Sequence, residues 1–130
     1  MNKGTLYTSY FANLRKYKQL NSFNISIERF PRNYLDFKKE GICHWPILAP
    51  SKELLNTYKE GAISEDVFRE KYIIQLSSNR ASVKALNTIR NALDNNINVS
   101  LIYYEKSNLF CHIHIIAEIF DELGYTIKEI

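Results

Sequence analysis

The sequence lacks the long apolar runs that membrane insertion and secretion require. No stretch of about 18 apolar residues occurs among the 130, so we expect no transmembrane span. The first residues, MNKGTLYTSYF, lack the apolar core of a signal peptide, and a cytoplasmic protein is therefore expected. Cysteine is scarce too. Cys43 and Cys111 are the only two, and they are expected to be free thiols in a reducing compartment.

Charge of one sign is also limited. The net charge is +3, from 17 basic and 14 acidic residues, and the run LRKYK is the only local basic excess. Clusters that bind nucleic acid are usually denser, so we interpret this run as a solvated surface and do not expect a nucleic-acid partner. Repeats, low-complexity stretches and linkers are absent from the sequence, and residues 1–130 are expected to form a single domain.

Hydrophobic patterns predict the order β, β, several helices, β, α, β. Alternating residues favour strands within 5–11 and 22–30, and a near-continuous apolar run predicts a strand within 98–105 that is covered on both faces. A helix follows from about residue 111, and residues 125–130 suit a last strand. Residues from about 32 to 50 are predicted to form a loop, in which 33–41 has the pattern of one or two helical turns.

The helices carry clear start and stop signals. Ser51 and Ser64 are expected N-caps, Gly61 and Gly124 are expected to follow helix ends, and a third helix is predicted over 80–93. Helical spacing then predicts the buried sides. These are Val67, Phe68, Tyr72, Ile74 and Leu76 in the second helix, Val83, Leu86, Ile89, Ala92 and Leu93 in the third, and Ile115, Ile116, Ile119, Phe120 and Leu123 in the last.

Strands separated by helices favour an α/β protein. We expect a Rossmann-like three-layer sandwich with a mainly parallel sheet of about four to five strands, flanked by helices. In such sheets ligands bind outside the carboxyl ends of the strands. Three junctions qualify, at residues 8–10, 28–29 and 104–114, and parallel strands would bring all three to one edge. A binding site is predicted there.

The third junction holds the most reactive side chains. Cys111 and His112 fall in the first turn of the predicted helix, where unpaired N–H groups favour a phosphate or a thiolate. Cys111 can equally be interpreted as a small buried hydrophobic residue, and His112 as a hydrogen-bonded core histidine. His114 stands four residues before Glu118 and so could form an exposed pair with it.

The remaining candidates have two interpretations each. Glu105 ends a buried strand and needs a partner, for which Arg29 is suited, although Arg29 could also bind a phosphate. Lys106 is either a phosphate ligand or a solvated loop residue. Trp45 either stacks on a base or closes the core.

Zinc is not expected. The ligand atoms exist in Cys43, His44, Cys111, His112 and His114, but their spacings differ from those of common zinc sites. We therefore expect neither a metal nor a cofactor.

The segment LIYYEKSNLFCHIHIIAEIF resembles the motif of the family called domain of unknown function 488, which reads Leu-Cys-Tyr-Glu-Lys, a short turn, then Cys-His-Arg-His. The stretches LYTSYF, ISIERFP, LAPSKELL and TYKEGAISEDVFREKY agree in order, so the resemblance covers nearly the whole chain. It implies a Rossmann-like fold and no settled activity. Tyr103 and Ile113 depart from the motif by replacing a cysteine and an arginine, whereas the matching positions are Arg29, Tyr104, Glu105, Lys106, Cys111, His112 and His114.

These observations lead to a non-catalytic protein that binds a nucleotide-like molecule of the ADP-ribose or cyclic-nucleotide type. The composition is rich in Asn, Ile, Lys and Tyr, whose codons are AT-rich, and this suggests a phage anti-defence protein that sequesters a signalling nucleotide. One alternative is a nucleotide- or nucleoside-directed hydrolase or glycosidase that uses Glu105, Cys111 and His112. Another is a protein- or nucleic-acid-binding module. The sequence also leaves open whether the chain forms a homodimer. The expected ligand-binding residues are Tyr7, Ser9, Tyr10, Arg29, Trp45, Tyr104, Glu105, Lys106, Cys111, His112 and His114.

Overall fold

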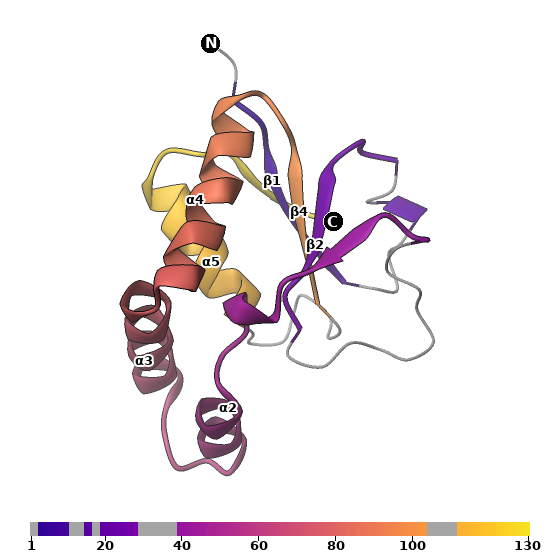
Figure 1. Cartoon of the computed structure of the whole chain (residues 1–130). Helices are drawn as coiled ribbons and strands as arrows, with labels where there is room; N and C mark the ends of the chain where they lie inside the picture. Colours follow the sequence, from indigo (N-terminus) through magenta and orange to yellow (C-terminus); the bar gives the residue numbers. More distant parts are fainter. Residues whose placement is uncertain (1–2, 11–14, 17–18, 29–38, 104–111) are drawn as a thin grey trace.

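The computed structural model describes residues 3–10, 15–16, 19–28, 39–103 and 112–130. Within these ranges the chain forms five strands, four α-helices and a short 3-10 helix (Figure 1). In chain order they are β1 (Leu6–Tyr10), β2 (Phe23–Ser26), β3 (Ile42–His44), η2 (Pro46–Leu48), α2 (Lys52–Lys59), α3 (Glu65–Ser78), α4 (Arg80–Asp94), β4 (Val99–Tyr103), α5 (His112–Glu122) and β5 (Ile127–Glu129).

All five strands are parallel and form one sheet in the order β3-β2-β4-β1-β5. The connection from β3 to β4 carries α2, α3 and α4, and the connection from β4 to β5 carries α5. Both move toward the β5 edge, so right-handed crossovers put α4 and α5 on one face of the sheet. Figure 1 shows both helices on that face. The expected fold class, an α/β Rossmann-like sandwich, is confirmed.

The two faces of the sheet differ in chemistry. Leu6, Ile25 and Leu101 face the helices and belong to the main apolar core. The alternate positions point to the opposite face, and they include four buried polar residues: Ser9, Asn24, Ser26 and Ser100. All five residues of β4 are buried, so both faces of the sheet are covered there, as its apolar sequence predicts.

Local signals account for the helix ends. Ser51 Oγ accepts the N–H of Leu54 at 3.1 Å, and Ser64 Oγ accepts the N–H of Val67 at 3.3 Å, so both predicted N-caps are confirmed. Gly61 follows the end of α2 with a φ of +77°, a left-handed conformation that glycine adopts without strain. The third predicted helix is confirmed as α4, one residue longer than expected.

Two groups of expectations are wrong. Residues 42–44 form strand β3 inside the stretch predicted to be a loop, because they pair with β2 at the edge of the sheet. The helical turns predicted over 33–41 lie largely outside the described residues. Four residues expected to be buried are exposed instead, by 36 to 55%: Val67, Ile74, Val83 and Leu123.

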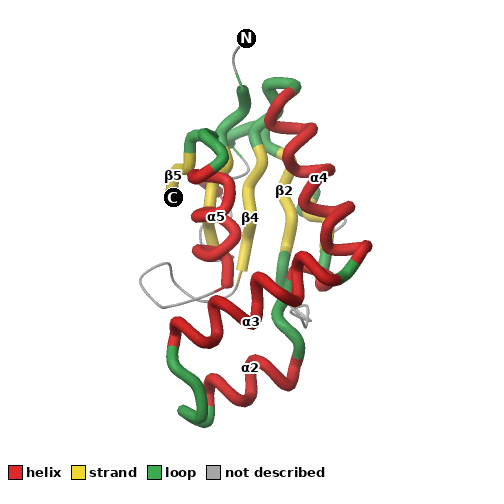
Figure 2. The backbone as a smooth tube through the Cα atoms, turned by 90° about the vertical axis from the view of Figure 1, so that its left-hand side faces the viewer, coloured by secondary structure: helices red, strands yellow, loops and turns green. Residues whose placement is uncertain are grey.

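The position of α3 explains part of this exposure. It lies beyond the carboxyl ends of β2 and β4 and packs on α2, α4 and α5 rather than on the sheet (Figure 2). It therefore buries only the side that carries Phe68, Tyr72 and Leu76. Val67 and Ile74 lie on the other side of the helix, seven residues apart. The helix is apolar on more sides than its single packed face requires.

Candidate functional site

The sheet has a switch point between β1 and β4. These strands are neighbours, yet the chain leaving β1 crosses toward the β3 edge and the chain leaving β4 crosses toward the β5 edge. Right-handed crossovers in opposite directions put these two connections on opposite faces of the sheet, and open parallel sheets bind ligands in the crevice outside the carboxyl ends of such neighbouring strands. Tyr10 and Tyr103 are register partners at this edge, and Ser9 pairs with Ile102 one residue earlier. Two predicted site residues, Ser9 and Tyr10, therefore lie at the crevice.

Ser9 is unusual among the residues at this edge. It is 1% exposed, and its Oγ has no hydrogen-bond partner among the described residues. Burying a hydroxyl without a hydrogen-bond partner costs free energy compared with leaving it exposed to water. Most buried hydroxyls therefore bond to the protein, to a water molecule or to a ligand. By register its side chain points to the face opposite α4 and α5.

A row of register partners, three of them polar, runs from Ser9 across the sheet. Ser9, Ile102, Ser26 and His44 are register partners on successive strands. His44 Nδ1 lies 3.2 Å from Ser26 Oγ, and partial burial lowers the pKa of His44 from its usual 6.5. One row earlier, Ser22 Oγ lies 2.6 Å from Asn24 Oδ1 and 2.7 Å from Ser100 Oγ. The alternating pattern of residues 22–30 predicted a strand there but did not assign this polar face to the site.

His112 begins α5 and points inward. It is 7% exposed, and its Nε2 lies 3.0 Å from the carbonyl oxygen of Ile27. Because a carbonyl only accepts hydrogen bonds, this contact assigns the proton to Nε2, and Nδ1 is then the acceptor atom of the neutral ring. The rings of Tyr72 and Tyr103 approach the imidazole edge-on, with centroids 5.9 and 6.5 Å away.

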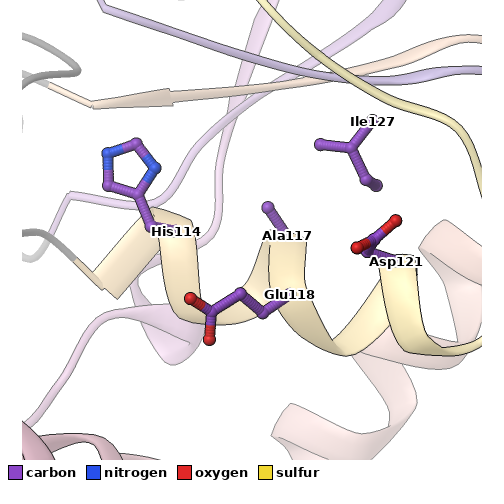
Figure 3. Close-up of a pocket in the computed structure, with 5 residues that line it drawn as sticks. All are labelled: His114, Ala117, Glu118, Asp121 and Ile127. Carbon is purple, nitrogen blue, oxygen red and sulfur yellow. The ribbon is translucent and has the colours of Figure 1, made fainter.

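His114 points away from His112, as residues two apart on a helix do. Its ring also lies edge-on to Tyr103, with centroids 6.3 Å apart. It also lines an open groove of about 320 Å³ along α5 and β5, together with Ala117, Glu118, Asp121 and Ile127 (Figure 3). Glu118 forms an ion pair with Arg69 of α3 at 2.5 Å, so this carboxylate has a partner on a neighbouring helix.

Two other predicted site residues lie away from the crevice. Tyr7 pairs with Ser100 and precedes the end of β1 by three residues, which is about 10 Å along a strand. Trp45 follows β3, two strands beyond β4, and packs edge-on against Phe23 with centroids 5.5 Å apart. Trp45 is part of the margin of the core, in agreement with the structural interpretation of this residue.

Five predicted site residues lie outside the described part of the chain: Arg29, Tyr104, Glu105, Lys106 and Cys111. Among their described neighbours, Tyr103 ends β4, His112 begins α5 and Glu28 lies two residues beyond the end of β2, all at the same edge of the sheet. Among the residues that the structure describes, no three His, Cys, Asp or Glu side chains gather as metal ligands would. Cys43 is exposed as a free thiol on β3.

The fold and this edge define a Rossmann-like protein whose candidate ligand site lies at the switch point of a parallel sheet. A family model described as the active DUF488-N3 subclade, DUF488-N3a, matches residues 10–124. The chain belongs to this family, as the motif around residues 101–120 indicated. Comparisons with curated proteins and with solved structures found no match. Within the described ranges, no helix has the length and apolar character needed to cross a bilayer.

Proposed function

We propose that the protein binds a nucleotide-like small molecule, of the ADP-ribose or cyclic-nucleotide type, in the crevice between β1 and β4. The observation that carries this proposal is the buried hydroxyl of Ser9 at the switch point, which has no partner among the described residues. A ligand hydroxyl or phosphate oxygen would supply the missing hydrogen bond. Tyr10 is half-buried at the same strand end, where its ring could pack against a base.

The anionic part of the ligand is assigned to the groups that follow β2 and β4. The guanidinium of Arg29 and the ammonium of Lys106 would neutralise phosphate, and the first turn of α5 near Cys111 would add backbone N–H donors. Glu105 would accept hydrogen bonds from ribose or base, and Tyr104 would contribute a further ring. These five assignments come from the sequence and from the position of their described neighbours.

The test compares two serines in matched environments. Ser9 and Ser82 both carry a buried hydroxyl without a partner among the described residues, but Ser82 lies in α4 on the other side of the sheet. Titration calorimetry with ADP-ribose and with a panel of cyclic nucleotides should show binding to the wild type. Ser9→Ala should weaken it by about 1 kcal/mol, roughly fivefold in Kd, and Ser82→Ala should leave it unchanged. Equal effects of both variants, or no binding by the wild type, would contradict the proposal.

We propose that the biological role of this binding is sequestration, in which a phage anti-defence protein removes a signalling nucleotide of the host's defence. Native mass spectrometry of freshly purified protein tests tight retention. An added mass of several hundred daltons that leaves on denaturation is expected, and its identity would name the nucleotide. A bare polypeptide mass would contradict the tight form of the proposal.

An enzyme is the second candidate, because the matching family model is described as an active subclade. In that case Cys111 would act as nucleophile or Glu105 as nucleophile or base, and the Nδ1 atom of His112 would be the ring position able to take a proton. Incubating a nucleotide at a hundred-fold excess over protein separates the candidates. An enzyme converts more than one molecule per chain and loses turnover but not affinity in Cys111→Ala or Glu105→Gln, whereas a binder returns its ligand unchanged.

A further inference from the structure

Ile27 occupies the point where β2 leaves the sheet. Its N–H donates to the carbonyl of Ile102 at 3.1 Å, which joins the end of β2 to the end of β4. Its own carbonyl lies beyond the last residue of β2 and accepts from His112 Nε2. Ile27 is 0% exposed, and a buried carbonyl at a strand end needs a donor from elsewhere in the fold. His112 supplies that donor from 85 residues away.

The surroundings of His112 hold its ring in one orientation. Tyr72 of α3 contacts one edge of the imidazole, and the Tyr72 hydroxyl donates to the buried carbonyl of Leu48 in η2. Tyr103 at the end of β4 contacts the ring as well. One side chain therefore connects α5 to β2 and packs against α3 and β4, at the edge of the sheet where the ligand is proposed to bind.

We infer that His112 is a positioning residue, which fixes the start of α5 to the end of β2 through the carbonyl of Ile27, and that it is not itself a ligand contact. The effect that we expect of His112 on ligand affinity rests on the proposed function. The segment after Ile27 carries Arg29 and the segment before His112 carries Lys106 and Cys111, so one hydrogen bond holds together the two junctions that are assigned to the phosphate. This changes the role that the sequence motif suggested for His112.

Three variants separate positioning from general stability. His112→Phe keeps a planar ring but leaves the Ile27 carbonyl without its donor, and His112→Gln can return a donor N–H near the position of Nε2. Tyr72→Phe is the matched control, because it removes the donor from another buried carbonyl, that of Leu48, and keeps the ring that packs on His112. For each variant the melting temperature, the amide hydrogen exchange of Ile27 and Ile116, and the Kd for ADP-ribose are measured. Ile27 N–H donates to Ile102 O, and Ile116 N–H is the first in α5 with an acceptor within the helix. Heteronuclear NMR of the wild type reports the tautomer of His112.

Positioning predicts a ring that is protonated at Nε2. His112→Phe should speed exchange at both Ile27 and Ile116 and weaken ADP-ribose binding about tenfold, because small displacements of binding groups are costly. His112→Gln should recover most of both properties. Tyr72→Phe should lower the melting temperature but leave the Kd within about twofold of the wild type.

Other results overturn the inference. An Nδ1–H tautomer would contradict the contact with Ile27, and an affinity loss that His112→Gln fails to recover would make the imidazole a direct ligand. If the wild type binds none of the nucleotides, the proposed function fails and the inference is judged on hydrogen exchange alone. Faster exchange at both junctions then supports it, and an effect confined to α5 refutes it.

Discussion

Gly4 stands where the chain enters β1, and it should be intolerant of any side chain. A Cβ at this position would lie 2.0 Å from the carbonyl oxygen of Ile97 and 2.5 Å from its carbonyl carbon. Real Cβ atoms essentially never approach within 3.0 Å, so Gly4→Ala must move two backbone segments apart by about 1 Å.

Three hydrogen bonds hold these segments together, and their loss sets the expected decrease in the free energy of unfolding. Gly4 N–H donates to Leu93 O at 2.7 Å, Thr5 N–H to Asn98 Oδ1 at 2.9 Å, and Val99 N–H to Thr5 O at 3.1 Å. At about 1 kcal/mol each, their loss would lower the free energy of unfolding by about 3 kcal/mol. For a chain of this size that corresponds to a decrease of roughly 10 °C in melting temperature.

Circular dichroism during heating measures this effect, with Gly61→Ala as the control. Gly61 also has a special conformation, with a φ of +77°, but no atom of the described residues lies within 4 Å of the point that a Cβ would occupy, so only backbone strain of about 1 kcal/mol is expected. If Gly4→Ala lowers the melting temperature no more than Gly61→Ala does, the close approach of Gly4 to the Ile97 carbonyl is refuted. Gly4 lies at the edge of the sheet opposite Tyr10, so ligand affinity below the melting temperature should be unchanged, in contrast to Ser9→Ala.

Three further predictions concern polar contacts. Tyr125→Phe removes a hydroxyl that donates to Asp94 Oδ1 at 2.6 Å and accepts from Arg90 Nε at 3.3 Å, and urea unfolding should show a loss of about 1–2 kcal/mol; an unchanged midpoint would contradict this. Arg69→Met breaks a half-exposed ion pair with Glu118, so its cost should stay below about 1 kcal/mol and vanish in 1 M salt. Burial lowers the pKa of His44 below 6.5, so the neutral ring is favoured in the folded state. The free energy of unfolding should therefore be greatest above pH 6.5 and fall as the pH drops toward the folded-state pKa. In urea unfolding at a series of pH values, His44→Gln should remove that part of the pH dependence.

Features with local causes could be predicted from the sequence. The N-caps at Ser51 and Ser64 and the full burial of 99–103 depend on neighbouring residues and on periodicity, which the sequence displays directly. Strand β3 has only three residues and lies in a stretch rich in loop signals. It exists because it pairs with β2, to which Trp45 N–H adds a hydrogen bond at 2.8 Å, and such pairing cannot be read from the segment itself.

The same distinction separates the predicted and the unpredicted parts of the site. The order of elements predicted at which edge of the sheet the site lies. Which residues form the row that begins at Ser9 depends instead on the register of the strands. Tyr7 and Ser9 point to the same face, and only the pairing with β4 shows that Ser9 is near the carboxyl end while Tyr7 is not. The partner of His112 is a backbone carbonyl, which carries no residue-specific signal and is therefore invisible to sequence analysis.

The two histidines of the motif cannot serve one reacting atom in the same way. Both rings lie edge-on to Tyr103, but the helix directs the two side chains apart. His112 is tied to β2 through Nε2, whereas His114 borders the groove along α5. A mechanism that uses His112 would act through Nδ1 in a fixed ring, and one that uses His114 would act beside the groove. Tyr103 lies edge-on to both imidazole rings and replaces a cysteine of the family motif, so this member differs from that motif at a residue that both of its histidines approach.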